Sequence, residues 1–363
     1  MTVLDMAPAE SAPPPDPPTT PRRPGPRSFR RLALAVGAYL GAVVIFSAFV
    51  AAKHQNPVTV WRAMIHSTLL QGSSLQEIAM RAVPISLAAL AVAVPARAGL
   101  VNVGGEGQLI LGAVAATGIG VAIGADVPGP LAWLLMAGGG AAAGAAWAGL
   151  AGALRAWLGA NEAVTTLLLN FVANDIMLYL IYQPWKDPHG SGQPQSRPLP
   201  HHAQLPGLFA SQVNTSVVVA LVAAAAIWWL LRRSHWGFAL RVVGGNGEAA
   251  RRCGLPVSKL MIQSMLVGGA LAGLGGMLNL AGLELRLRPD ITLTFGYVAF
   301  LASWLGRHHP VKVVGAAVLF SAIALSGNGV QLSTGLDGAT VDVLLALIVA
   351  APLFLTKFRA AAQ

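Results

Sequence analysis

Long apolar stretches alternate with short polar segments along the chain from residue 32 onward. The apolar stretches cover residues 32–52, 79–96, 107–125, 131–154, 163–183, 215–231, 260–282, 292–306, 311–327 and 338–356. A helix of about 20 apolar residues crosses the hydrocarbon core of a bilayer, so this pattern predicts about ten transmembrane helices. The stretch 292–306 is short, which suits a tilted or re-entrant segment. We therefore expect an all-α integral membrane protein.

The polar segments divide the chain further. Residues 1–29 are rich in Pro, Ser, Thr and Ala, cannot bury a core and are expected to form a disordered cytoplasmic tail. The transmembrane domain would then cover residues 30–363. Arginines precede its first apolar stretch, which is either a cleaved signal peptide or an uncleaved anchor, and its length favours the anchor. Residues 184–213 are too polar and too rich in Pro and Gly to span, and we expect an external loop there.

Charge sets the expected orientation. The chain has 24 Lys and Arg against 14 Asp and Glu, a net charge of +10. Most of these cations fall on one side of the membrane if both termini are cytoplasmic, as the positive-inside rule requires. Topology and contact with membrane lipid then account for the positive charge, and no nucleic-acid partner is expected.

Composition excludes several kinds of site. Only 10% of the residues are charged, against about 25% in soluble domains. The single Cys excludes a disulfide framework and any Cys-based metal site. The sequence contains neither a Walker A loop nor an HExxH motif. We therefore expect no catalytic residues, no metal site and no cofactor in this chain.

Residues 234–258 form a basic cytoplasmic segment between two apolar stretches. Within it, Asn246 suits a helix N-cap, Glu248 suits a first turn, and Gly254 suits a C-terminal stop, which predicts a short helix from Gly247 to Cys253. Such a helix is marginal alone. The segment is therefore either a basic loop held by lipid headgroups or a helix that docks into a partner.

Polar side chains also enter two apolar stretches. In the segment VNVGGEGQLILG, the carboxylate of Glu106 and the amides of Asn102 and Gln108 lie among glycines. Ionisable residues inside a membrane are costly and mark functional sites by default. The alternative is that Glu106 lies at the cytoplasmic interface near Arg97 as a solvated end charge.

The second stretch, NEAVTTLLLNFVAND, carries polar residues at every fourth position, which places them along one helix face. They are Glu162, Thr166, Asn170 and Asn174. Such a stripe either bonds a neighbouring helix or lines a wet passage.

Small residues are frequent in the apolar stretches. Gly140/Gly144 and Gly269/Gly273 form GxxxG pairs, which let helix backbones approach closely. They predict packing within the bundle, the alternative being a subunit interface.

The basic cytoplasmic segment resembles the coupling-helix region of ABC importer permeases of the ribose and nucleoside class. Their pattern runs G-aromatic-x-x-R-A-V-G-x-N-x-x-A-A-R-x-x-G-I. This chain matches it at Gly237, Phe238, Arg241, Val243, Gly244, Asn246, Ala249, Ala250, Arg251 and Gly254. The resemblance implies that Asn246, Glu248, Ala249, Ala250, Arg251 and Gly254 contact the ATPase subunit.

The segment from Asn102 to Gln108 resembles the N-[IV]-G-x-E-G-Q signature of the nucleoside, or basic-membrane-protein, branch of that class. The Asn161–Glu162 helix start with the later Asn170 is also similar. The resemblance therefore implies a solute passage lined by the polar residues of the two stretches. These are Asn102, Glu106, Gln108, Glu162, Thr166, Asn170 and Asn174.

The resemblance, which covers roughly residues 76–356, implies a multi-pass permease subunit of the bacterial inner membrane that imports nucleosides or related small polar solutes. The implied partners are an ATPase subunit that binds ATP and Mg²⁺, a second permease subunit and an external solute-binding protein. Three alternatives remain open: an importer of simple sugars, an ion-coupled secondary transporter that uses Glu106 or Asp175, and an intramembrane enzyme.

Overall fold

The computed structural model describes residues 26–123, 127–190, 192–208, 211–292 and 294–360. This part of the chain is helical, with two isolated antiparallel bridges between loop residues and no longer strands. The helices are α1 (Pro26–Ala52), α2 (Pro57–Ile65), α3 (Ser74–Ala96), α4 (Gly105–Ala122), α5 (Gly129–Leu158), α6 (Glu162–Tyr182), α7 (Thr215–Arg233), α8 (His235–Gly245), α9 (Gly247–Arg252), α10 (Val257–Asn279), α11 (Phe295–Leu305), α12 (Pro310–Thr334) and α13 (Thr340–Ala360). Short π-helical turns, η1 (His66–Leu70) and η3 (Leu280–Glu284), extend α2 and α10, and η2 (His201–Ala203) is a 3₁₀ turn.

Fewer helices are long enough to span a membrane than the sequence suggested. Within the described residues, seven have the required length and hydropathy: α3, α4, α5, α6, α7, α10 with η3, and α12. A bent pair, α1 with α2 and η1, raises the number to eight if it counts as one span, although the two parts meet at 117°. The expected total of about ten is therefore not reached. The apolar helix α11 has 11 residues and is about 16 Å long, roughly half the thickness of the hydrocarbon core.

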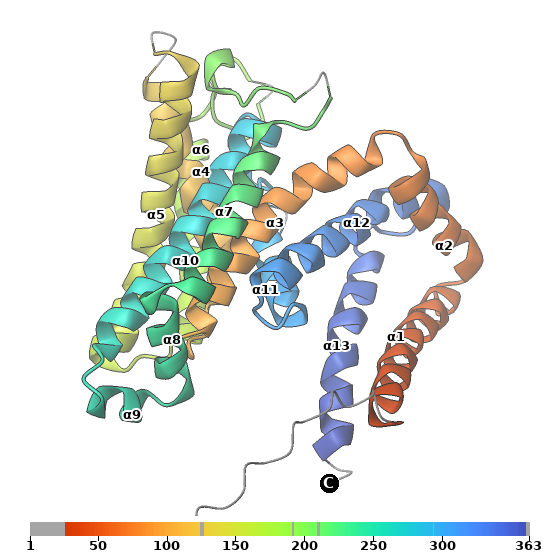
Figure 1. The fold of residues 1–363 in the computed structure, drawn as a ribbon. Helices are drawn as coiled ribbons and strands as arrows, with labels where there is room; N and C mark the ends of the chain where they lie inside the picture. Colours follow the sequence, from red (N-terminus) through yellow and green to blue (C-terminus); the bar gives the residue numbers. More distant parts are fainter. Residues whose placement is uncertain (1–25, 124–126, 191, 209–210, 293, 361–363) are drawn as a thin grey trace, which may run out of the picture.

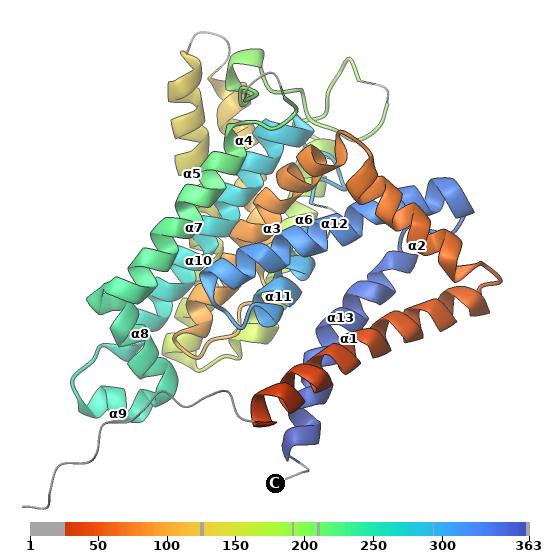
Figure 2. The same ribbon diagram turned by 45° about the vertical axis from the view of Figure 1, so that its right-hand side comes forward.

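The helices form one bundle with an attached layer (Figure 1). α3 and α10 lie at its centre, packed against each other and against α4, α5 and α7. α11 and α12 cover another face of α3, and α1 packs along α13 beyond them (Figure 2). α9 lies at one end of the bundle and the long loop between α6 and α7 at the other (Figure 1).

Glycines on α5 and α10 hold the centre of this bundle together. A Cβ added at Gly144 would lie 2.3 Å from the carbonyl oxygen of Gly269, and one at Gly273 would lie 2.1 Å from that of Gly140. The two helix backbones are therefore in direct contact, which only glycine allows. The two GxxxG pairs pack on each other, which confirms the prediction of packing within the bundle.

The loop between α6 and α7 is anchored to the segment that follows η3. The backbone N–H of Ser196 donates to the carbonyl of Leu287 at 3.0 Å, and that of Leu199 donates to Leu285 at 2.8 Å. These two backbone groups of the loop are thus paired, as polar backbone away from water requires.

The expected disordered tail lies almost entirely outside the described residues. Residues 1–25 are not described, and α1 already begins at Pro26. The helical segment therefore starts a few residues before the predicted boundary at residue 30.

Candidate functional site

After α3 the chain turns back into the bundle instead of leaving it. Gly99 adopts a left-handed conformation with φ of 78°, and the amide of Asn102 then donates to the carbonyl of Ala91 at 3.1 Å. A Cβ added at Gly105 would lie 3.8 Å from Ala88. Ala88 precedes the end of α3 by eight residues, so α4 begins roughly 12 Å inside that end. We name residues 98–104 the re-entrant segment.

Two buried amides fix the fold of the re-entrant segment. Asn102 donates to the side-chain oxygen of Gln108 at 3.2 Å, and Gln108 donates back to Asn102 at 3.0 Å. The same oxygen of Asn102 accepts from the N–H of Gly104 at 2.9 Å. Asn102 and Gln108 are 0% and 1% exposed, so these hydrogen bonds replace water that the site excludes.

The polar stripe on α6 pairs with the backbone of the re-entrant segment. The Glu162 carboxylate accepts from the N–H of Val101 at 3.2 Å, and the Thr166 hydroxyl accepts from that of Val103 at 3.1 Å. One turn further, the amide of Asn170 donates to the carbonyl of Val103 at 3.0 Å. Side chains of a helix thus satisfy backbone that lies in neither a helix nor a strand.

Glu106 joins the start of α4 to the start of α11. Its carboxylate accepts a hydrogen bond of 2.6 Å from the backbone N–H of Gly296, and the hydroxyl of Thr292 donates to its other oxygen. Gly296 is the second residue of α11, whose N–H is normally satisfied by an N-cap side chain. The N-cap residue of α11, Thr294, makes no side-chain cap. Glu106 therefore supplies the cap of α11 from another helix.

The N-termini of α4 and α11 meet at this point. A Cβ added at Gly296 would lie 2.1 Å from the backbone nitrogen of Glu106, so the two backbones touch. Each helix N-terminus carries a partial positive charge, and two such ends repel each other. A carboxylate between them reduces that repulsion, so the position demands an acidic side chain. Glu106 is only 7% exposed, which does not fit a solvated charge at the interface.

The structure thus brings six of the seven predicted passage residues into one buried cluster around the re-entrant segment. The seventh, Asn174, is half-buried on α6 and makes no hydrogen bond within the described residues. The hydrogen bonds give the six residues a positioning role. Their contact with a solute stays a prediction.

The predicted cytoplasmic helix is present as α9. Asn246 caps it, accepting from the N–H groups of Glu248 and Ala249 at 3.1 and 3.0 Å, and Gly254 follows it with φ of 80°. Arg252 pairs with Glu248 at 3.3 Å on the exposed face. Ala250 is fully buried against the bundle, so it does not reach outward as the other residues of the segment do.

Arg97 connects the end of α8 to the turn between α11 and α12. Its guanidinium donates to the carbonyl of His308 at 2.8 Å, in the turn between α11 and α12. A Cβ added at Gly244, near the end of α8, would lie 2.3 Å from the carbonyl of Arg97. Burial lowers the pKa of His308, and the nearby charge of Arg97 lowers it further. The lowered pKa favours the neutral imidazole beside this half-buried cation.

Comparison with known proteins decides the family. The family model described as "Branched-chain amino acid transport system / permease component" matches residues 74–352. The chain belongs to this permease family. The match covers every residue of the re-entrant segment and of α9, and it confirms the resemblance that their motifs indicated.

Curated relatives of this permease have the same general role. The glucose ABC transporter permease protein TsgB13 of Haloferax volcanii is 34% identical over 85% of this chain and 84% of its own length. The guanosine ABC transporter permease protein NupP of Bacillus subtilis is 30% identical over 88% of this chain and 90% of its own length. The nucleoside permease NupB of Lactococcus lactis is 26% identical over 88% of each chain. The permease is therefore similar to ABC transporter permeases over most of its length.

Sequence reasoning missed the two partners of the Glu106 carboxylate in this permease. Thr292 and Gly296 are more than 180 residues from Glu106 in sequence, and neither carries a signal that points to it. Asp175, by contrast, was already marked by the sequence as a candidate for ion coupling. Asp175 lies within the membrane-spanning α6 and is exposed, on the face opposite Asn170.

Proposed function

We propose that this chain is the permease subunit of an ATP-driven ABC importer, which moves nucleosides or related small polar solutes across a bacterial inner membrane. The observation that carries the proposal is α9, a short, capped helix with an exposed charged face, in a chain of this permease family. Such a helix needs a partner to be stable, and the energy of transport needs an ATPase outside this chain.

The nucleoside class is supported by relatives for guanosine and for nucleosides and by the segment Asn102–Gln108. A simple sugar is the second candidate, because the glucose permease of Haloferax volcanii is 34% identical. Both classes are small, neutral and rich in hydroxyl groups. The ion-coupled alternative has less support, since Glu106 is occupied as a helix cap.

Transport in this proposal begins at α9. An ATPase subunit binds the exposed face formed by Glu248, Ala249 and Arg251, and its closure moves α9. The end of α8 then presses on Arg97, whose backbone it touches at Gly244. Arg97 leads directly into the re-entrant segment and also holds His308 at the end of α11. One displacement would therefore reach both helix N-termini that meet at Glu106.

The passage would lie along the outward face of α6, between this chain and a second permease subunit. That face carries Asp175 among exposed apolar side chains, including Leu168, Phe171 and Tyr179. A carboxylate inside a membrane faces protein or water rather than lipid. In this arrangement the cluster around the re-entrant segment supports the wall of the passage from behind.

The test is uptake by the complete complex. The permease, its partner permease, the ATPase and the binding protein are reconstituted in proteoliposomes with ATP inside or outside. The proposal expects uptake of labelled nucleosides that requires ATP and all subunits. Uptake by this chain alone, driven by an ion gradient, would contradict it. Uptake of glucose but not of nucleosides would instead show that the transported solute is a simple sugar.

A further inference from the structure

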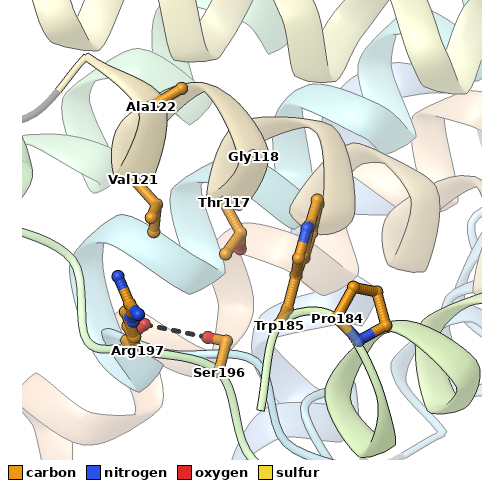
Figure 3. A pocket seen from close by; sticks show the side chains of 8 residues that line it. All are labelled: Thr117, Gly118, Val121, Ala122, Pro184, Trp185, Ser196 and Arg197. Atoms are coloured by element: carbon orange, nitrogen blue, oxygen red, sulfur yellow. Dashed lines mark hydrogen bonds between the residues drawn. The ribbon is translucent and has the colours of Figure 1, made fainter. Parts of the chain in front are cut away.

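A cavity opens at the end of the bundle opposite α9, between the outer turns of α4 and the loop that follows α6 (Figure 3). Its volume is about 270 Å³, near the lower end of the range for small-molecule sites. Thr117 and Gly118 contribute one wall, and Trp185, Ser196 and Arg197 contribute the other. The cavity could therefore hold a single ring system of a small solute.

The wall formed by the loop is fixed by backbone pairing. Lys186 and Ser196 form an antiparallel bridge, and the Ser196 hydroxyl accepts from the N–H of Leu287 at 3.0 Å. The N–H of Trp185 donates to the carbonyl of Leu180, at the end of α6, at 2.8 Å. The indole also packs on Gly118, where an added Cβ would lie 3.0 Å from the ring. Trp185 is thus held in place before any ligand binds.

The lining combines the flat ring of Trp185 with three polar side chains, those of Thr117, Ser196 and Arg197. The Ser196 hydroxyl already donates to the carbonyl of Arg197. Figure 3 shows the Trp185 ring standing on one side of the cavity and the Arg197 side chain on the other. The Arg197 guanidinium has no ion pair or hydrogen bond within the described residues. The Thr117 hydroxyl donates to its own helix at Ala113 and can only accept from a ligand. The lining contains no carboxylate and no side-chain amide.

We propose that this cavity binds the base of a 6-oxopurine nucleoside, such as guanosine, before the solute enters the passage. The base would stack on Trp185, and the two neighbouring acceptors of its O6/N7 edge would receive the forked N–H groups of Arg197. A simple sugar fits this lining less well, because it has neither an aromatic base to stack on Trp185 nor a pair of base acceptors for Arg197. The proposal rests on the proposed function, and it goes further by naming the residues and the base.

The experiment compares four variants in the reconstituted complex: Trp185→Ala, Trp185→Phe, Arg197→Gln and Lys186→Gln. Initial rates of ATP-dependent uptake are measured for guanosine, uridine and glucose. Lys186→Gln is the matched control, since it removes a cation next to Trp185 that does not line the cavity. Binding of labelled guanosine to the complex without binding protein is measured by equilibrium dialysis.

The proposal expects Trp185→Ala and Arg197→Gln to raise the KM for guanosine by about ten- to a hundredfold, and to change that for glucose little. Arg197→Gln should change the KM for uridine little, whereas Trp185→Ala should raise it as well, because any base can stack on an indole. Trp185→Phe keeps a ring to stack on and should retain most of the affinity, as should Lys186→Gln. An unchanged KM in Arg197→Gln, or an equal loss for all solutes, would overturn the proposal. Loss of stimulation by the binding protein with normal guanosine binding would also overturn it and assign the cavity to protein docking.

The failure of the proposed function looks different. In that case the wild-type complex imports none of the three solutes with ATP, whatever residue occupies position 185 or 197. If the wild-type complex imports nucleosides and the Trp185 and Arg197 variants behave as wild type, the importer function is retained. Only the proposal that the cavity binds the base is then rejected.

Discussion

The carboxylate of Glu106, in the first turn of α4, accepts a hydrogen bond of 2.6 Å from the backbone N–H of Gly296, in the first turn of α11. Two helices that begin inside the bundle thus share one cap. This contact joins α4, which follows the re-entrant segment, to α11, the short stretch that the sequence suggested was tilted or re-entrant.

Replacing Glu106 tests this cap. Glu106→Ala leaves the N–H of Gly296 buried without a partner, which costs about 1–3 kcal/mol for such a group. We expect a clear drop in the midpoint of thermal unfolding in detergent and a loss of uptake. Glu106→Gln keeps an acceptor but loses the charge, so its loss should be smaller. Glu77→Ala, which breaks a half-exposed pair with Arg81, should behave as wild type. Equal stability of Glu106→Ala and wild type would contradict the cap.

Two glycines on α5 provide a matched pair for the packing of the bundle. Gly144→Ala places a Cβ 2.3 Å from the backbone of Gly269, and rigid backbone cannot yield. We expect misassembly or a much lower thermal midpoint. Gly138 lies on the same helix, but a Cβ added there meets nothing within 4 Å. Gly138→Ala should therefore be neutral or slightly stabilising. Similar melting curves for the two variants would show that α5 and α10 do not touch as described.

Neighbouring alanines separate docking from folding at α9. Ala249→Glu adds a bulky acid to the exposed face and should uncouple the complex, so that ATP hydrolysis continues while nucleoside uptake falls. Ala250→Glu buries the same acid against the bundle and should reduce the amount of folded permease instead. Uptake and hydrolysis are measured on the same proteoliposomes. Normal coupling of hydrolysis to uptake in Ala249→Glu would show that α9 is not the contact with the ATPase.

His308 predicts a pH dependence. Burial, with help from Arg97, lowers the pKa of His308 below its usual value near 6.5. A lowered pKa means that the folded state favours the neutral imidazole. The resulting stabilisation is present above the usual pKa and is lost as the pH falls through the lowered value.

Thermal stability measured from pH 8 to pH 5 tests this prediction. The wild type should lose stability toward the acid end, where a charged imidazole would join Arg97 and Arg241. His308→Gln cannot titrate and should show a flatter profile over the same range. Parallel profiles for the two proteins would exclude His308 as the titrating group.

Asp175 tests the placement of the passage. If its carboxylate faces water or solute, Asp175→Leu should reduce uptake strongly, and Asp175→Asn should reduce it less. If the face of α6 meets lipid, Asp175→Leu should insert and transport at least as well as wild type, because it removes a charge from the membrane. Leu168→Ala, on the same face, serves as the control for side-chain size.

The sequence was sufficient for features that depend on local patterns. Asn246 and Gly254 predicted both ends of α9, and the spacing of Gly140 and Gly144 predicted close packing. It was insufficient where the backbone changes direction without a long polar stretch. Residues 98–104 fold back beside α3, and apolar runs alone do not distinguish such a path from a plain crossing. The partner of Glu106 could not be predicted because nothing near Gly296 marks it as a site for a carboxylate.

The stripe on α6 limits how long a buried extended segment can be. Four residues of helix advance about 6.0 Å and two residues of extended chain about 6.6 Å, so the two spacings drift apart by roughly 0.6 Å at each step. After a few steps the side chains of a straight helix no longer reach the amides beside them. The spacing of Glu162, Thr166 and Asn170 therefore fits a backbone segment of this length. An insertion between Val101 and Val103 would leave polar backbone without a partner in the membrane.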